Sequence, residues 1–89
     1  MVTFDETKRS ANLAKHGIDL AECGAVFDFP MLTIEDDRVA YGEQRFISLG
    51  WLGGRVVVMA WTGRKAAPHI ISCRVCDKHE THKYFKEAV

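Results

Sequence analysis

Hydrophobic and polar positions alternate with a period of two along the second half of the chain. The runs are rich in β-branched and aromatic residues, and turn-forming segments such as Gly53-Gly54 separate them. This period places successive side chains on opposite faces of a strand, so each run is predicted to be one strand of a sheet. Short turns between consecutive strands predict an antiparallel meander. The four predicted strands are residues 32–35, 45–52, 55–62 and 69–74.

The first thirty residues lack this alternation and carry helix signals instead. Residues 5–16 contain neither Gly nor Pro, and the Lys-His-Gly sequence of residues 15–17 suits the last turn and end of a helix. Asp19 followed by Glu22 predicts the start of a second helix, which ends before Pro30.

Asp77 followed by Glu80 repeats the same start signal and predicts a closing helix that runs to about Ala88. With 89 residues, of which 47% are hydrophobic, the chain has the size and composition of one globular domain, residues 1–89. The predicted class is therefore α+β: two N-terminal helices, a four-stranded antiparallel meander sheet and a C-terminal helix.

The net charge is zero, but the charges are unevenly distributed along the chain. Residues 19–43 contain seven acidic residues and one basic residue, whereas the rest contains five acidic and eleven basic residues. Such a separation can produce a basic face, the surface that binds a phosphate backbone. The alternative, that the charges mix in three dimensions, stays open.

Four residues of the kinds that bind zinc, Cys73, Cys76, His79 and His82, follow one another at intervals of three. Structural zinc modules usually separate a Cys pair from a His pair by a dozen or more residues. Here the two pairs nearly touch, and strand alternation gives no reason for Cys73 to point toward the histidines. We therefore expect small packing cysteines and no metal.

The chain also indicates its compartment. Three cysteines with no export signal predict a cytoplasmic protein without a disulfide framework. The longest apolar run, residues 56–61, is too short to span a bilayer, so no membrane association is expected.

One face of the first predicted helix gathers groups that could contact RNA. Lys8, Asn12, Lys15 and His16 are spaced as i, i+4, i+7 and i+8, which places them on the same side. The same pattern is typical of an ordinary solvated face, and periodicity alone does not separate these two interpretations.

A second set of polar residues lies at predicted strand ends and on the closing helix. Arg45, Arg64 and Arg74 stand at or beside strand ends, and Glu80 and Tyr84 are paired at i and i+4. Guanidinium groups neutralise charge that builds on phosphoryl oxygens, and a histidine titrates near neutral pH, so such a set suits phosphodiester chemistry. Each arginine could also be a plain surface residue.

Polar residues and short motifs over almost the whole chain form a recognisable pattern. They are Phe4-Asp5, Lys8, Asn12, Lys15-His16-Gly17-Ile18, Glu43, Arg45, Thr62, Arg64, Ile70-Ile71-Ser72-x-Arg74, Glu80 and Tyr84. This pattern resembles that of the BrnT family of bacterial type II toxins. The Lys-His-Gly and Ile-Ile-Ser-x-Arg motifs are its more specific part.

The resemblance implies a RelE-like ribonuclease fold and inhibition of translation and growth by RNA cleavage, with no cofactor. It also implies a BrnA-type antitoxin, a ribbon-helix-helix protein that masks the toxin and represses their shared operon, so operator DNA is contacted only through the antitoxin. The family's strand-to-helix junction usually reads Ser-Ala-Arg-x-Ala, which places Cys73 and Cys76 where alanines are common.

Two positions depart from the family pattern. His69 occupies a place where the family often has Arg, and Cys76 precedes the closing helix. The basic lining of the site is therefore expected to be thinner in this chain than in its relatives.

The resulting hypothesis is a metal-independent endoribonuclease in which the ribose 2′-hydroxyl attacks its own phosphate. The assigned roles are proton transfer by His16 or a lysine in its place, phosphate charge neutralisation by Arg64 and Arg74, and substrate holding by Lys8, Lys15, Arg45 and Tyr84. Two alternatives stay open: a non-catalytic RelE-like or ParE-like module, or a decayed toxin, that engages an acidic partner, and a zinc-dependent adaptor.

Overall fold

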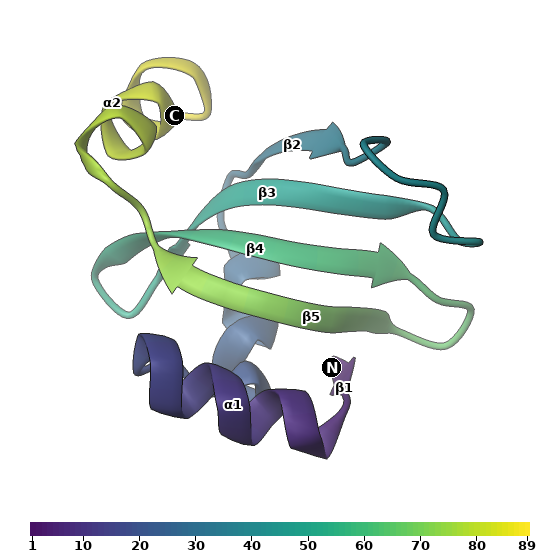
Figure 1. Ribbon diagram of the computed structural model, residues 1–89. Coiled ribbons are helices and arrows are strands. Elements are labelled where there is room, and N and C mark those ends of the chain that lie inside the picture. The colour runs from purple at the N-terminus through teal and green to yellow at the C-terminus, as the bar shows by residue number, and fades with distance from the viewer.

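The computed structural model describes residues 1–89 and contains one five-stranded sheet with helices packed around it (Figure 1). The order of the strands across the sheet is β1-β5-β4-β3-β2. The elements along the chain are β1 (Thr3–Phe4), α1 (Glu6–His16), the 3₁₀ helix η1 (Leu20–Asp28), β2 (Leu32–Glu35), β3 (Arg45–Leu52), β4 (Arg55–Gly63), β5 (Pro68–Val75) and α2 (Lys78–Glu87).

The predicted meander is confirmed. Strands β2 to β5 pair in sequence order, each antiparallel to the next, and their bounds agree with the predicted runs to within one residue. The alternation that predicted them follows from packing, because one face of each strand meets the core and the other meets solvent or α2.

The prediction of four strands in a purely antiparallel sheet was incomplete. The two residues of β1 pair in parallel with β5, Thr3 opposite His69 and Phe4 opposite Ile70, so the sheet is mixed. A two-residue strand has no period to detect, and its formation depends on a partner near the other end of the chain.

Helix α1 forms as predicted, with a cap at each end. The Asp5 side chain accepts hydrogen bonds from the Thr7 and Lys8 amides, which would otherwise lack partners in the first turn. The helix ends at Gly17, whose φ of 70° is a left-handed conformation that glycine adopts without strain.

The second helical segment is a 3₁₀ helix rather than the expected ordinary helix. Its buried residues, Leu20, Cys23 and Val26, recur every three positions, which matches the three residues per turn of a 3₁₀ helix. The Asp19 start signal still functions, because its carboxylate accepts a hydrogen bond from the Ala21 amide.

Helix α2 begins with the predicted capping box. The Asp77 carboxylate accepts from the Glu80 amide, and the Glu80 carboxylate accepts from the Asp77 amide. No helix of the protein has the length and apolar character needed to cross a membrane.

The core lies between η1 and one face of the sheet. Val57 and Met59 of β4 are fully buried there against Leu20, Cys23 and Val26. Val58 lies between them in sequence and therefore points to the opposite face, which carries α2 (Figure 1). We call this second side the open face; its residues include Leu32, Ile34, Ile47, Leu49, Val58, Ala60 and Ser72.

Candidate functional site

Four strands contribute one polar residue each to a row across the open face. Thr3, His69, Thr62 and Arg45 are paired in register through β1, β5, β4 and β3. Residues directly opposite one another in neighbouring strands project from the same face of a sheet. The Thr3 hydroxyl and His69 Nδ1 are 2.8 Å apart and share a hydrogen bond. We call these four residues the polar row.

Two arginines converge at one end of the polar row. The carboxylate of Glu43 lies 3.8 Å from Arg45 Nε and 3.7 Å from Arg64 Nη2, one oxygen facing each guanidinium. The Arg45 guanidinium also stacks on the Tyr41 ring, 3.9 Å from its centre. One carboxylate therefore holds two cationic groups close together at the edge of the open face.

Tyr41 is itself held by a buried carboxylate. Its hydroxyl donates to Asp36 Oδ2 at 3.2 Å, while Arg38 donates to both carboxylate oxygens of Asp36 at 2.7 and 2.9 Å. Hydrogen bonding to Arg38, the largest cause, lowers the pKa of Asp36 to about 2 despite its burial. The ring that supports Arg45 thus rests on an ionised carboxylate.

This lowered pKa predicts a loss of stability in acid. A carboxyl group with a depressed folded-state pKa contributes stability above its unfolded value, near 4, and the contribution disappears as pH falls through about 2. We expect Asp36→Asn to lower the melting temperature at pH 6 but to match the wild type near pH 2. Thermal melts across this range test it, with the exposed Asp37→Asn as the matched control. Equal melting temperatures of Asp36→Asn and wild type at pH 6 would contradict the prediction.

His69 stands among charges from several elements. Its pKa is lowered, first by partial removal from water and then by the Arg64 guanidinium; Lys8 adds to this, while Glu43 and Asp5 act in the opposite direction. The imidazole is therefore neutral through a wider range of pH than a free histidine.

The polar row also contains unused hydrogen-bonding capacity. The Thr62 hydroxyl and Arg45 Nε are buried atoms without a hydrogen-bond partner in the protein, and Thr62 is only 2% exposed. Buried polar groups are usually satisfied, so an exception needs an explanation, and binding sites are one place where exceptions occur.

A hollow in the surface lies beside β5, between this strand and α1. This hollow, which we call the helix groove, has a volume of about 260 Å³. It brings together all four residues of the predicted face of the first helix: Lys8, Asn12, Lys15 and His16. The full lining is Lys8, Ala11, Asn12, Lys15, His16, Ile71 and Ser72.

Asn12 is at the floor of the helix groove and has a structural role. It is 6% exposed, and its amide pairs with both backbone groups of Cys73: Oδ1 accepts from the amide at 3.0 Å, and Nδ2 donates to the carbonyl at 2.9 Å. Nδ2 also donates to the Ile18 carbonyl at 2.9 Å. The side chain thus continues the sheet edge where β1 has ended and fixes α1 against β5.

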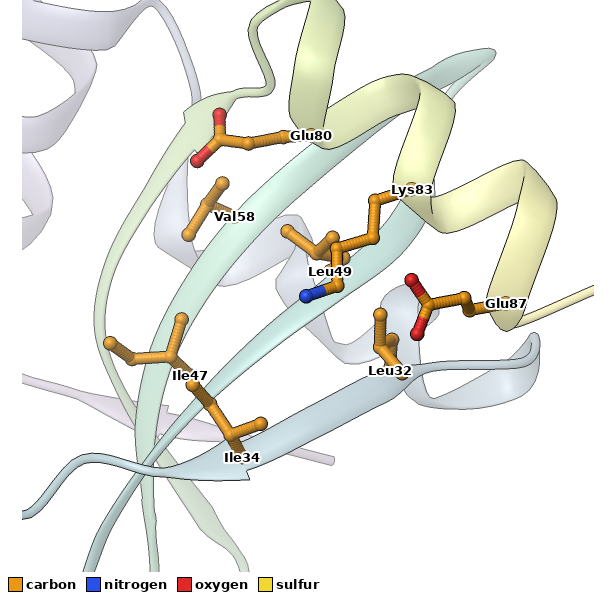
Figure 2. Close-up of a pocket in the computed structure, with 8 residues that line it drawn as sticks. All are labelled: Leu32, Ile34, Ile47, Leu49, Val58, Glu80, Lys83 and Glu87. Atoms are coloured by element: carbon orange, nitrogen blue, oxygen red, sulfur yellow. The ribbon is translucent and has the colours of Figure 1, made fainter.

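Another hollow, about 320 Å³ in volume, lies between α2 and the strands β2 to β4 (Figure 2). Figure 2 shows apolar side chains of the sheet below the helix and charged side chains projecting from the helix above them. The lining consists of Leu32, Ile34, Ile47, Leu49, Val58, Glu80, Lys83 and Glu87. We call this hollow the apolar groove.

Arg74 lies at the far end of the open face from Arg64. It is paired in register with Val58, whereas Arg64 follows the last residue of β4, so six residues of strand, roughly 20 Å, separate the two positions. Its guanidinium donates to both carboxylate oxygens of Glu80 at 2.9 and 2.8 Å. The structure therefore does not bring Arg64 and Arg74 to one phosphate, as their assigned roles required.

Tyr84 is placed in the packing under α2. It is 3% exposed, and its hydroxyl donates to the Pro30 carbonyl at 2.9 Å. A side chain with its polar atom satisfied in this way ties α2 to the segment before β2. The predicted substrate-holding residue Tyr84 therefore has neither an exposed ring nor a free hydroxyl to offer to RNA in this structure.

The four residues of zinc-binding type do not converge on one point. Cys73 is fully buried on the η1 side of the sheet, while His79 and His82 are exposed on α2. Contact with the Cys23 thiol and burial raise the pKa of Cys73 far above the usual range, so this sulfur is protonated at neutral pH. No group of three or more His, Cys, Asp or Glu side chains is arranged to hold a metal ion.

The charge separation seen in the sequence is partly cancelled in the structure. Asp19 accepts hydrogen bonds from Arg9 at 2.7 and 2.9 Å, and Glu43 faces Arg45 and Arg64. Acidic residues of the central segment thus pair with basic residues from outside it. Lys8 and Lys15 in the helix groove and Lys83 in the apolar groove take part in none of the ion pairs.

Comparison with known proteins identifies the chain. Residues 4–80 match the family described as the ribonuclease toxin, BrnT, of type II toxin-antitoxin systems. Among solved structures, the Brucella abortus ribonuclease toxin BrnT is similar, with 25% identity and a TM-score of 0.67 over 86% of this chain and 96% of that one. No sequence match is found among curated proteins.

The fold and the family match define a class, the ribonuclease toxins of type II toxin–antitoxin systems. Within it, this chain belongs to the BrnT family. The resemblance inferred from the sequence is thereby confirmed, and the chain is a ribonuclease toxin that acts on RNA and has an antitoxin partner.

Sequence reasoning missed part of the polar row. Of its members, Thr62 enters the sequence analysis only as part of the family pattern, His69 only as a departure from it, and Thr3 not at all; Glu43, which faces the two arginines, also enters only through the family pattern. The available signal was register: once Arg45 is placed opposite Thr62 by a meander with short turns, Thr62 falls opposite His69 on the next strand.

Proposed function

We propose that the chain is a metal-independent endoribonuclease that cuts single-stranded RNA across the open face, with the scissile phosphate at the polar row. The observation that carries the proposal is the convergence of Arg45 and Arg64 on one carboxylate beside His69. A phosphate that takes the place of the Glu43 carboxylate would meet both guanidinium groups, the geometry that neutralises a phosphoryl group well.

The chemistry needs no metal ion. The ribose 2′-hydroxyl loses its proton and attacks the adjacent phosphorus, and the 5′-oxygen leaves and takes up a proton. The products are a 2′,3′-cyclic phosphate and a free 5′-hydroxyl. Arg45 and Arg64 stabilise the extra negative charge of the pentacovalent phosphoryl group.

The helix groove holds the RNA backbone beside the cleaved bond. Lys8 and Lys15 supply positive charge there, and Ser72 belongs both to this groove and to the open face. His16 lies at the far end of α1, an 11-residue helix and hence roughly 15 Å long, so we assign it to binding rather than to proton transfer at the arginines. The apolar groove offers a surface for an unstacked base.

The test of this function is cleavage by the purified protein. We expect RNA to be cut with unchanged rate in excess EDTA, because no step uses a metal, and the fragments to carry 2′,3′-cyclic phosphate and 5′-hydroxyl ends. The protein is incubated with RNA, either free or in a cell-free translation extract, and the ends of the fragments are analysed. The end groups distinguish attack by the 2′-hydroxyl from metal-dependent hydrolysis by water. With free RNA as substrate, loss of cleavage in EDTA and its recovery on adding Mg²⁺ would overturn the metal-independent reaction.

We further propose that the antitoxin is a BrnA-like ribbon-helix-helix protein and that the toxin reaches operator DNA only through it, both in the cytoplasm, where RNA substrate is present. Charge steers such a partner to the arginines, and apolar contacts retain it. Co-expression with the ribbon-helix-helix protein encoded beside this gene should restore growth that the toxin alone arrests. A neighbouring protein that neither binds nor rescues would contradict this pairing.

A further inference from the structure

We propose that His69 is the general base of the cleavage reaction, and that Thr3 orients it. This inference rests on the proposed function and adds to it the group that removes the proton from the 2′-hydroxyl. It departs from the assignment of that role to His16.

The geometry of the polar row carries the inference. His69 lies on the open face directly beside Thr62, and Arg45 lies one strand further on. Arg64 lies in the turn that joins β4 to β5, next to Thr62 and His69. A phosphate held by the two arginines therefore lies next to the imidazole. No other histidine is in this region: His16 lines the helix groove, and His79 and His82 belong to α2.

Thr3 selects the form of the imidazole that can act as a base. Its hydroxyl is 2.8 Å from Nδ1. When Nδ1–H donates to this oxygen, Nε2 has no proton and presents a lone pair, the state that a general base requires. In the balanced step, Nε2 takes the 2′-hydroxyl proton as the new O–P bond forms, and the 5′-oxygen leaves with the electron pair of the broken O–P bond. The 5′-oxygen is protonated from water.

The charges around His69 keep it neutral under ordinary conditions. Arg64 from the β4–β5 turn and Lys8 from α1 disfavour the imidazolium, whereas Glu43 before β3 and Asp5 at the start of α1 favour it. Partial burial adds to the first effect, and the net result is a lowered pKa. Cleavage should consequently rise with pH on the acidic side, as the imidazole loses its proton, and level off below the usual histidine value.

The experiment is single-turnover cleavage of RNA as a function of pH by the wild type and by His69→Gln, with His79→Gln as a matched control on exposed α2. We expect His69→Gln to lower the plateau rate by about 10² to 10⁴, the usual range for acid–base catalysis, and to abolish the acidic limb. His79→Gln should behave as the wild type. Thermal melts of each variant monitor folding.

The Thr3→Val variant distinguishes a role of Thr3 in orienting the His69 imidazole from a role in the stability of the fold. We expect it to lower cleavage severalfold in the wild-type background and to have no further effect on His69→Gln, because the hydroxyl acts only through the imidazole. A purely structural Thr3 would lower both rates alike, and that result would overturn its positioning role.

These measurements separate a failure of the general-base role of His69 from a failure of the proposed ribonuclease function. Wild-type protein that cuts RNA while His69→Gln retains the full rate and the acidic limb would overturn this inference and leave the proposed function standing. Wild-type protein that cuts no RNA, free or in the translation extract, would overturn both.

Discussion

Arg64→Ala should lower RNA cleavage by about a hundredfold, and Arg45→Ala by a similar factor, each equivalent to about 3 kcal/mol of transition-state stabilisation. Both guanidinium groups face one carboxylate in the unbound site, within 3.8 Å, and a phosphate in that position would contact both. Since they act on the same developing charge, the double variant should lose less than the product of the two single losses.

The matched control is Arg55→Ala. Arg55 is an exposed arginine at the β3–β4 turn, at the other end of the sheet, and its loss should leave cleavage nearly unchanged. Arg74→Ala should have a much smaller effect than Arg64→Ala, since its guanidinium is engaged with Glu80. If Arg74→Ala removed activity and Arg45→Ala and Arg64→Ala did not, the catalytic centre would lie under α2 instead.

Asn12→Ala should destabilise the protein by about 3 kcal/mol, because it removes one side chain that satisfies three backbone groups. The Cys73 amide and carbonyl and the Ile18 carbonyl would each lose a partner in a buried place. For a domain of this size the melting temperature should fall by roughly 15 °C.

Chemical and thermal unfolding of the purified variant measure this effect. Ser10→Ala on the exposed side of the same helix is the matched control and should change stability by less than about 0.5 kcal/mol. An Asn12→Ala protein that melts with the wild type would show that water replaces the amide and that the edge of β5 needs no side-chain cap.

Local patterns in the sequence predicted the elements whose packing is periodic. The strands β2 to β5 alternate between core and open face, and Gly17, Asp19 and Asp77 carry their helix-end signals in their own side chains or backbone. For η1 the period of three lies in the residues that prove to be buried, Leu20, Cys23 and Val26, and the other apolar residues of the segment hide it in the sequence.

Long-range register accounts for what the sequence did not reveal. Whether Arg64 lies near Arg45 or near Arg74 depends on the register of β3, β4 and β5. The types of these three residues do not encode that register. Tyr84 shows the same limit, since helical spacing beside Glu80 placed both on one face without saying that the face is buried. The role of Asn12 also emerged only when its helix was seen against an unpaired strand edge.

The pairing of β1 with β5 has a consequence for synthesis of the protein. Thr3 and His69 are 66 positions apart, and the short parallel strand forms only when both segments are present. Such distant contacts close late in folding, after the entropy of a long loop has been overcome. A growing chain therefore has no complete polar row until residues near 70 have emerged from the ribosome. Most of the toxin chain is therefore synthesised before its nuclease site can form.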